Sequence, residues 1–273
     1  MPRPNDSEMS IIEHLEELRW HLLKSVVAIF VCAIVVFVYD DFFLNHLLFD
    51  PLQVDFFSYH KLCQLGAWLE MKDSFCLDKI NITLQNTEPA GQFMTYITSG
   101  FTIGFIIAFP YVFFQIWSFI KPALLDGELR VASGLLFWTT LLFLCGIMFG
   151  YYILLPFSIN FLSSFSMNTM IKNDINVSSY FDLLTSLVLG CGIMFEMPIV
   201  VYFLTKIGLV TPAFLTTYRK YSIVVILVIA AIITPPDVIS QLIVSVPLFI
   251  LYEISIYVSM RIVLKEKLNQ NNI

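Results

Sequence analysis

The chain has 273 residues, of which 58% are hydrophobic and only 13% are charged, with a formal net charge of −6. A soluble domain carries about twice that fraction of charged residues, so the composition excludes an ordinary soluble protein and indicates one that crosses a membrane several times. The sequence also contains no basic patch with interleaved aromatic residues, and we therefore expect no nucleic-acid partner.

The N-terminal segment is polar and partly acidic, without a cationic region that leads into a short apolar one, so we expect no cleaved signal peptide. Ser10 and Glu13 form the pattern of a capping box at the start of a helix. Apolar residues then recur on one helical face, while Glu13, Glu17 and His21 share another. We predict an amphipathic cytosolic helix, within residues 1–19, that runs directly into the first span. Because it is rich in glutamate rather than lysine and arginine, it suits a cationic partner better than an anionic lipid surface.

Six apolar stretches follow, and we predict an all-α membrane domain of six transmembrane helices over residues 20–263. The expected limits are 20–39, 91–120, 131–165, 183–205, 221–235 and 238–260. The fifth stretch has about 15 residues and would be about 22 Å long as a helix, which is short for a span. The turn "TPPDV" between the fifth and sixth stretches predicts a tight helical hairpin.

Six spans place both termini on the same side of the membrane. That side receives eleven of the fifteen lysine and arginine residues, and the other side receives Lys61, Lys72, Lys79 and Lys172. The positive-inside rule therefore predicts that both termini, including a tail at 264–273, are cytosolic. The long polar loop at 40–89 is then expected to face outward.

Cysteine and motif patterns say little about chemistry. Cys63 and Cys76 share the loop at 40–89 and can pair if that loop lies outside the cytosol. The sequence has no metal-ligand spacing, no nucleotide-binding fingerprint and no hydrolase motif. We therefore expect no cofactor and no enzymatic activity.

Three acidic residues lie in or beside the apolar stretches, where an ionised carboxylate is costly and usually faces a polar cavity or a partner. Capping of the sixth helix explains Asp237, and packing against Ser255 or a neighbouring hydroxyl explains Glu253. Glu196 precedes a helix-distorting proline, Pro198, and no lysine or arginine within the spans is available to pair with it. Of the three acids, Glu196 therefore has the weakest structural explanation. If it has no partner, we expect its carboxyl group to be uncharged.

The second and third stretches each carry a pair of glycines four residues apart, which predicts close helix packing at Gly100, Gly104, Gly146 and Gly150. The turn between these stretches reads "WSFIKPALLDGELRV", in which Pro122 fits a helix start. Glu128 then falls in the first turn of the third helix, where capping alone explains it. Only the expected position of Glu128 on the same membrane face as Glu17 suggests that the two glutamates belong to one site.

Five segments match a known family in order and at its spacing: EHLEELRWHLLKS, FDPL, AFPYVFFQIWSFIKPALL, FEMPIVVYFL and ITPPDVISQLIVSVPLFILYEISIY. Over about residues 10–263 the chain resembles TatC, the polytopic subunit of the twin-arginine (Sec-independent) protein translocase, and the last segment is the most specific. The resemblance implies six transmembrane helices with cytosolic termini in a bacterial inner membrane. It also implies a concave, glove-like bundle with short fifth and sixth helices.

The resemblance implies a receptor that binds the twin-arginine signal peptides of folded substrates. It further implies assembly with TatA and TatB, or with a TatA-type protein alone, and with other TatC copies, in export driven by the proton-motive force. Matching positions imply signal-peptide contacts at Glu17, Arg19, Phe119, Pro122 and Glu128. We expect intramembrane polar or partner contacts at Glu196, Asp237, Gln241 and Glu253, and structural roles for Pro51 and Pro198.

Two features depart from the family pattern. His21 stands where a basic residue is common, and Leu129 separates Glu128 from Arg130, so the role of the local positive charge is open. The loop at 40–89 is also longer than in short members of the family.

Two alternatives to a translocase receptor remain at this point. A proton-coupled secondary transporter, with Glu196 and Glu253 as carriers, predicts paired discontinuous helices around a midplane site, and the sequence shows no clear repeat of that kind. A structural scaffold would not need acidic residues gathered at the cytosolic face.

Overall fold

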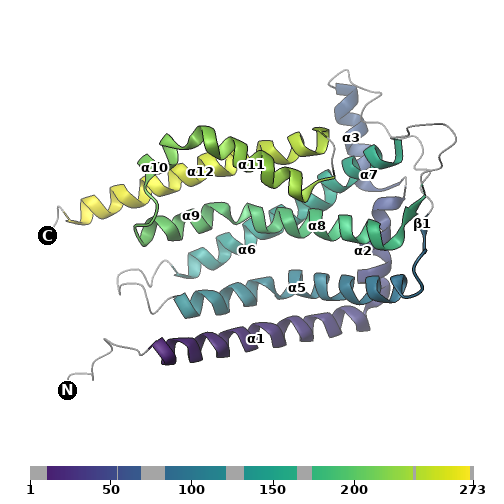
Figure 1. Cartoon of the computed structure of the whole chain (residues 1–273), viewed down its shortest axis with the longest axis horizontal. Coiled ribbons are helices and arrows are strands. Elements are labelled where there is room, and N and C mark those ends of the chain that lie inside the picture. Colours follow the sequence, from purple (N-terminus) through teal and green to yellow (C-terminus); the bar gives the residue numbers. More distant parts are fainter. Residues whose placement is uncertain are drawn as a thin grey trace. The chain divides into compact units, whose positions relative to one another are not determined.

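A computed structural model describes residues 11–53, 55–68, 84–120, 132–164, 174–235 and 238–270. The described chain is almost entirely helical and contains one pair of two-residue strands (Figure 1). It divides into two compact units, which are described separately below. The first unit comprises Met1–Leu44 and Tyr96–Thr140, and the second comprises Asn45–Thr95 and Leu141–Ile273.

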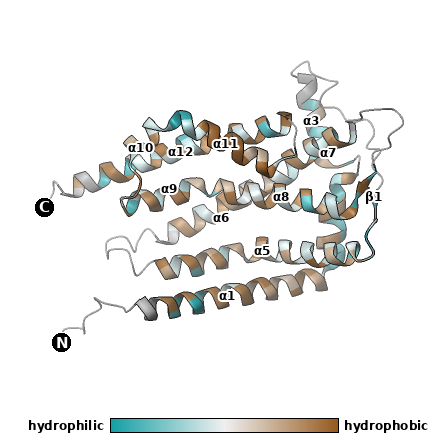
Figure 2. Ribbon diagram, viewed as in Figure 1, coloured by the Kyte–Doolittle hydropathy of each residue, from teal (hydrophilic) through white to brown (hydrophobic). Residues whose placement is uncertain are grey.

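Five helical stretches among the described residues are long and apolar enough to cross a membrane, namely Leu15–Val38, Gly91–Ile120, Gly134–Ser163, Val177–Lys206 and Val238–Lys265. Helix α11 (Arg219–Ile233) has 15 residues and corresponds to the predicted short fifth span. Figure 2 shows hydrophobic residues along most of these helices, with hydrophilic residues gathered near helix ends and around β1. The protein is therefore an all-α, multi-pass membrane protein, and its helices are compatible with the six predicted spans.

The first unit contains helix α1 (Ile11–Val38), most of the antiparallel helix α5 (Gly91–Ile120) and the start of α6 (Ala132–Phe149). The predicted amphipathic segment and the first span form the single continuous helix α1. A Cβ atom on Gly104 would lie 2.8 Å from the Ala33 nitrogen, and one on Gly100 would lie 2.3 Å from the Phe37 ring. Only glycine allows α1 and α5 to approach this closely, so the predicted packing role of the first glycine pair is confirmed.

The second unit begins with short helical segments that follow the π-helical stretch Asp41–His46. These are α2 (Leu47–Phe49), a 3₁₀ turn (Asp50–Leu52) and α3 (Phe57–Trp68). Three buried tyrosines fix the first two segments by donating to main-chain carbonyl oxygens. The hydroxyl of Tyr151 donates to Leu47 (2.7 Å), that of Tyr180 to Leu48 (2.9 Å) and that of Tyr59 to Pro51 (2.7 Å). Burial raises the pKa of the Tyr59 phenol, so this group stays a hydrogen-bond donor at physiological pH.

Two loops of the second unit are joined by a two-residue parallel pairing of β1 (Leu84–Gln85) with β2 (Ile175–Asn176), in which Leu84 lies opposite Ile175. Cys63 of α3 is disulfide-bonded, whereas Cys32, Cys145 and Cys191 are free thiols. The partner considered from the sequence, Cys76, lies outside the described residues.

The predicted third span is one continuous helical stretch that changes its winding. It consists of α6, a π-helical segment (Gly150–Leu154) and α7 (Leu155–Ser164). A Cβ atom on Gly146 would lie 2.6 Å from the Cys191 carbonyl oxygen, and one on Gly150 would lie 2.9 Å from that of Leu187. Both oxygens belong to α8 (Val177–Phe195), so the second glycine pair also allows a close helix contact.

The predicted fourth span is broken at Glu196, which ends α8 and precedes α9 (Met197–Lys206). Pro198 occupies the second position of α9 and is buried. Because proline has no N–H group, the regular hydrogen-bond ladder cannot continue through this point. The amide of Glu196 instead donates to Ile193 at 3.1 Å, closing a tight turn.

The remaining elements of the second unit are α10 (Pro212–Thr217), α11 and α12 (Val238–Gln270). Helix α12 is tied to α9 by the Thr205 hydroxyl, which donates to that of Ser259 at 2.9 Å. The sixth helix was expected to be short and to end at residue 260, but α12 has 33 residues and continues through most of the segment predicted as a tail. No glycine or proline follows Pro247, so nothing in the sequence ends the helix where the apolar stretch ends.

Candidate functional site

The candidate signal-peptide site lies in the first unit, where the N-terminal end of α1 meets the C-terminal end of α5. Glu17 and Arg19 of α1 are exposed, and Phe119 of α5 is half-buried. Pro122 and Glu128, the other two predicted contacts, lie outside the described residues. Three of the five predicted residues are thus placed by the structure at one end of this helix pair.

A hydrogen bond between the helices positions this end. The Nδ1 atom of His21 lies 2.6 Å from Oε1 of Gln115, and because that oxygen only accepts, the imidazole donates. Gln115 is buried, and the His21 ring also packs against Phe119, with centroids 6.4 Å apart at 59°. The Ser25 hydroxyl further donates to the His21 carbonyl oxygen at 2.9 Å.

Helical spacing carries Glu17 and Phe119 to the same end of the pair. Glu17 lies four residues before His21 and Phe119 lies four residues after Gln115, so each is one turn from the hydrogen-bonded pair and on its face. The result is an exposed carboxylate one turn from a hydrogen-bonded, aromatic-lined junction. A carboxylate in such a place can accept two parallel hydrogen bonds from a guanidinium, whose plane can also stack on an aromatic ring.

Gln115 is the residue of this end that sequence reasoning did not find. Its signal was present in the sequence, because Gln115 is the one amide side chain between residues 93 and 120 of this largely apolar stretch. The sequence did place His21 on the face of Glu17, but it did not indicate that these residues, 94 positions apart, pair with each other.

The acid at the break of the fourth span, Glu196, is buried in the second unit, with 9% of its surface exposed. Neither carboxylate oxygen makes a hydrogen bond of normal geometry within the part of the chain that the structure describes, although the main chain of Phe143 in α6 lies nearby. A buried carboxyl left in this state is costly, so contacts among the described residues do not explain the burial of Glu196.

The other acids of the spans are placed differently. Glu253 forms a two-point ion pair with Arg219, in which Nε and Nη2 each lie 2.9 Å from a carboxylate oxygen. The expected packing of Glu253 against Ser255 or a neighbouring hydroxyl is wrong, because both carboxylate oxygens pair with Arg219 and the Ser255 hydroxyl donates to the Leu251 carbonyl. Gln241 donates from Nε2 to the Leu227 carbonyl oxygen at 3.0 Å and thereby ties α12 to α11. Asp237 lies outside the described residues.

The chain resembles known proteins over most of its length. The family model for the Sec-independent protein translocase protein TatC matches residues 13–247. The chain belongs to the TatC family. Two TatC relatives support this. TatC from Blattabacterium sp. subsp. Periplaneta americana is 40% identical over 93% of this chain and 96% of its own length. TatCy from Bacillus subtilis is 37% identical over 95% of this chain and 92% of its own length.

Solved TatC structures agree with the fold. Two crystal structures of the twin-arginine translocase receptor TatC are each 34% identical to the chain. One has a TM-score of 0.71 and is matched over 90% of this chain and 99% of its own length, and the other has a TM-score of 0.66 over 91% and 98%. The protein is therefore a multi-pass membrane component of a Sec-independent protein translocase, which is a transport system.

Within this TatC fold, the two prolines predicted to be structural are both buried at the second position of a helical segment. Pro198 begins α9, and Pro51 lies in the 3₁₀ turn, where its carbonyl oxygen accepts the Tyr59 hydrogen bond. Among the described residues, no group of three or more histidine, cysteine or acidic side chains could hold a metal ion.

Proposed function

We propose that this protein is the receptor subunit of its translocase and that it binds the twin-arginine signal peptides of folded substrates. Both termini are cytosolic in this proposal, so the joined ends of α1 and α5 face the compartment in which substrates fold. The excess of lysine and arginine on the terminal side supports this orientation.

The observation that carries the proposal is the junction of His21 with Gln115 and Phe119, which holds Glu17 in a defined place. A hydrogen bond of 2.6 Å to a buried amide restrains the first helix against the fifth at this point. The exposed Glu17 carboxylate can then meet a guanidinium without first ordering the backbone that carries it, which lowers the entropic cost of binding. Glu128 supplies the second carboxylate, so each arginine of the pair receives one acid.

We further propose that partner subunits of the TatA and TatB type, or a TatA-type protein alone, and other copies of this chain assemble with the receptor. Glu196 is the proposed polar contact for a peptide or partner helix that enters the membrane. Its buried carboxyl has no hydrogen-bond partner among the described residues, so a donor from another chain would relieve the cost of its burial. The proton-motive force drives export in this scheme.

The secondary-transporter alternative is weakened by the ion pair in the second unit. A proton carrier must gain and lose its proton in the cycle, whereas Glu253 is held by two nitrogen donors of Arg219. Family membership and this pair together favour a protein translocase over a small-solute carrier.

The proposal is tested by photo-crosslinking a twin-arginine signal peptide to the full-length protein in membranes. Glu17→Ala and Glu128→Ala are each expected to reduce crosslinking severely. Glu16→Ala is the matched control, because Glu16 is also exposed on α1 but lies about 100° around the helix from Glu17. Crosslinking that persists in both test variants, or that falls equally in the control, would remove the recognition role from these residues.

A further inference from the structure

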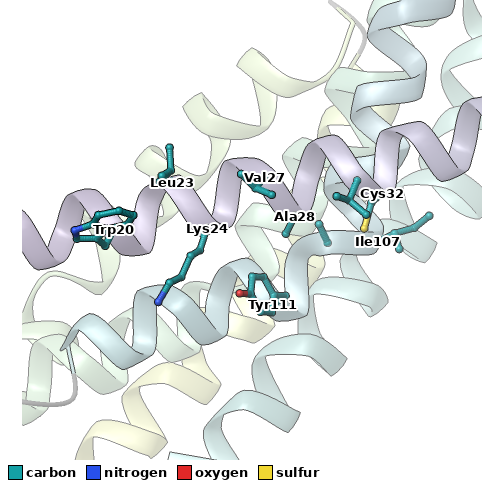
Figure 3. Close-up of a pocket in the computed structure, with 10 residues that line it drawn as sticks. Trp20, Leu23, Lys24, Val27, Ala28, Cys32, Ile107 and Tyr111 are labelled. Atoms are coloured by element: carbon teal, nitrogen blue, oxygen red, sulfur yellow. The ribbon is translucent and has the colours of Figure 1, made fainter.

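A groove runs between α1 and α5 in the first unit, with a volume of about 480 Å³ (Figure 3). On α1 it extends from Trp20 to Cys32, which is about 18 Å along the helix. Its floor contains small residues, Ala28 and the buried Ala108, and its apolar walls are exposed. Half of a bilayer's hydrocarbon core is about 15 Å thick, so the groove has the length of one leaflet.

Lys24 is the charged residue of this groove. It lies within the apolar stretch Leu15–Val38, and no described residue forms an ion pair with it. Side chains on a helix tilt toward its N-terminus, so the ammonium group is directed toward the end of the groove at Trp20. Figure 3 shows the Lys24 side chain extending toward α5, with the Tyr111 hydroxyl on the same side. A cation inside a membrane span needs an anionic or polar partner near the interface.

We propose that this groove binds one anionic glycerophospholipid. One acyl chain lies along the apolar walls, and the phosphate group lies beside the Lys24 ammonium. The Trp20 indole and the Tyr111 hydroxyl flank the same end, and both side chains are typical of the level of lipid headgroups. With the orientation proposed above, the lipid comes from the cytosolic leaflet, but the binding itself does not depend on that orientation.

The dimensions and the charge of the groove favour a lipid over a second helix. An α-helix is about 10 Å across, so only one edge of a helix would enter a groove of about 480 Å³. A hydrocarbon chain is thinner and fits between the apolar walls, over the small residues Ala28 and Ala108. The single cation at one end also complements a single phosphate.

The test uses two photoactivatable probes, phosphatidylglycerol and phosphatidylcholine, that carry the same diazirine on one acyl chain. Each is added to phosphatidylcholine vesicles that contain the full-length protein, and labelled residues are identified by mass spectrometry. We expect phosphatidylglycerol to label the groove at residues 20–32 and 107–111 about five-fold more than phosphatidylcholine, the ratio that corresponds to about 1 kcal/mol per lysine near an anionic phosphate.

Three variants distinguish the effect of the Lys24 charge on labelling from the effect of the apolar groove. Lys24→Gln should reduce the preference to about one, whereas Lys24→Arg, which keeps the charge, should retain it. Lys220→Gln removes an exposed lysine from the second unit and should leave the preference unchanged. Equal labelling by the two probes in the unmodified protein, or a preference that survives Lys24→Gln, would overturn the proposal, and the latter would show that another group supplies the preference.

Discussion

Substitution of Gly104 by alanine tests the close contact that holds α1 against α5. The added Cβ would lie 2.8 Å from the Ala33 nitrogen and 2.9 Å from its Cα, whereas ordinary contacts begin at 3.4 Å. Because both obstructing atoms belong to the backbone, the helices must separate locally by about 0.6 Å, and overpacking of this kind costs about 1–3 kcal/mol. The added alanine also favours the helix by up to about 1 kcal/mol, which hides part of that cost.

Gly134→Ala is the matched control, because nothing lies within 4 Å of a Cβ at this position of α6. The two variants share the gain in helix propensity, so the difference between them isolates the clash at Gly104. We expect Gly104→Ala to lose stability at a temperature about 2–10 °C below that of Gly134→Ala, as measured by size-exclusion chromatography of heated, detergent-solubilised protein. Equal or higher stability of Gly104→Ala would refute the close approach of α1 and α5.

Three further predictions concern the second unit. Tyr180→Phe removes the donor to the buried Leu48 carbonyl and should destabilise the protein by about 1–3 kcal/mol, measured as a lower melting temperature. A double-mutant cycle of Arg219→Gln and Glu253→Gln should give a coupling energy of at most about 1 kcal/mol, since both side chains are partly exposed. A larger value would indicate that the ion pair is shielded from water. Glu196→Gln should support export better than Glu196→Lys, because no cation of the described residues pairs with this carboxyl; equal loss of export in the two would mean that its ionisation matters.

Composition and local pattern predict the membrane helices well, because each span requires its own run of apolar residues. The same is true of the glycine pairs and of the break at Glu196, since backbone approach and the missing N–H of Pro198 are local properties. The end of α12 was missed because the limits of an apolar stretch mark where the membrane ends, and a helix continues beyond it until a residue breaks it.

Contacts between distant segments could not be read from the sequence. Arg219 pairs with Glu253 across 34 positions, and this depends on how α10 turns the chain back toward α12. His21 pairs with Gln115 across 94 positions, which depends on the register of α1 against α5. A carboxylate and its partner can be recognised as polar residues in apolar surroundings, but only the packing of the helices selects the partner.

Recognition of the arginine pair is tested by comparing the affinity of one signal peptide carrying Arg-Arg with that of the same peptide carrying Lys-Lys. Lysine cannot make the two parallel hydrogen bonds that a guanidinium makes with a carboxylate, so the unmodified protein should bind the Arg-Arg peptide more tightly. Glu17→Gln should remove most of that preference, whereas Glu16→Gln should preserve it. Equal binding of the two peptides by the unmodified protein, or a preference that Glu17→Gln leaves unchanged, would contradict recognition of the arginine pair at the joined ends of α1 and α5.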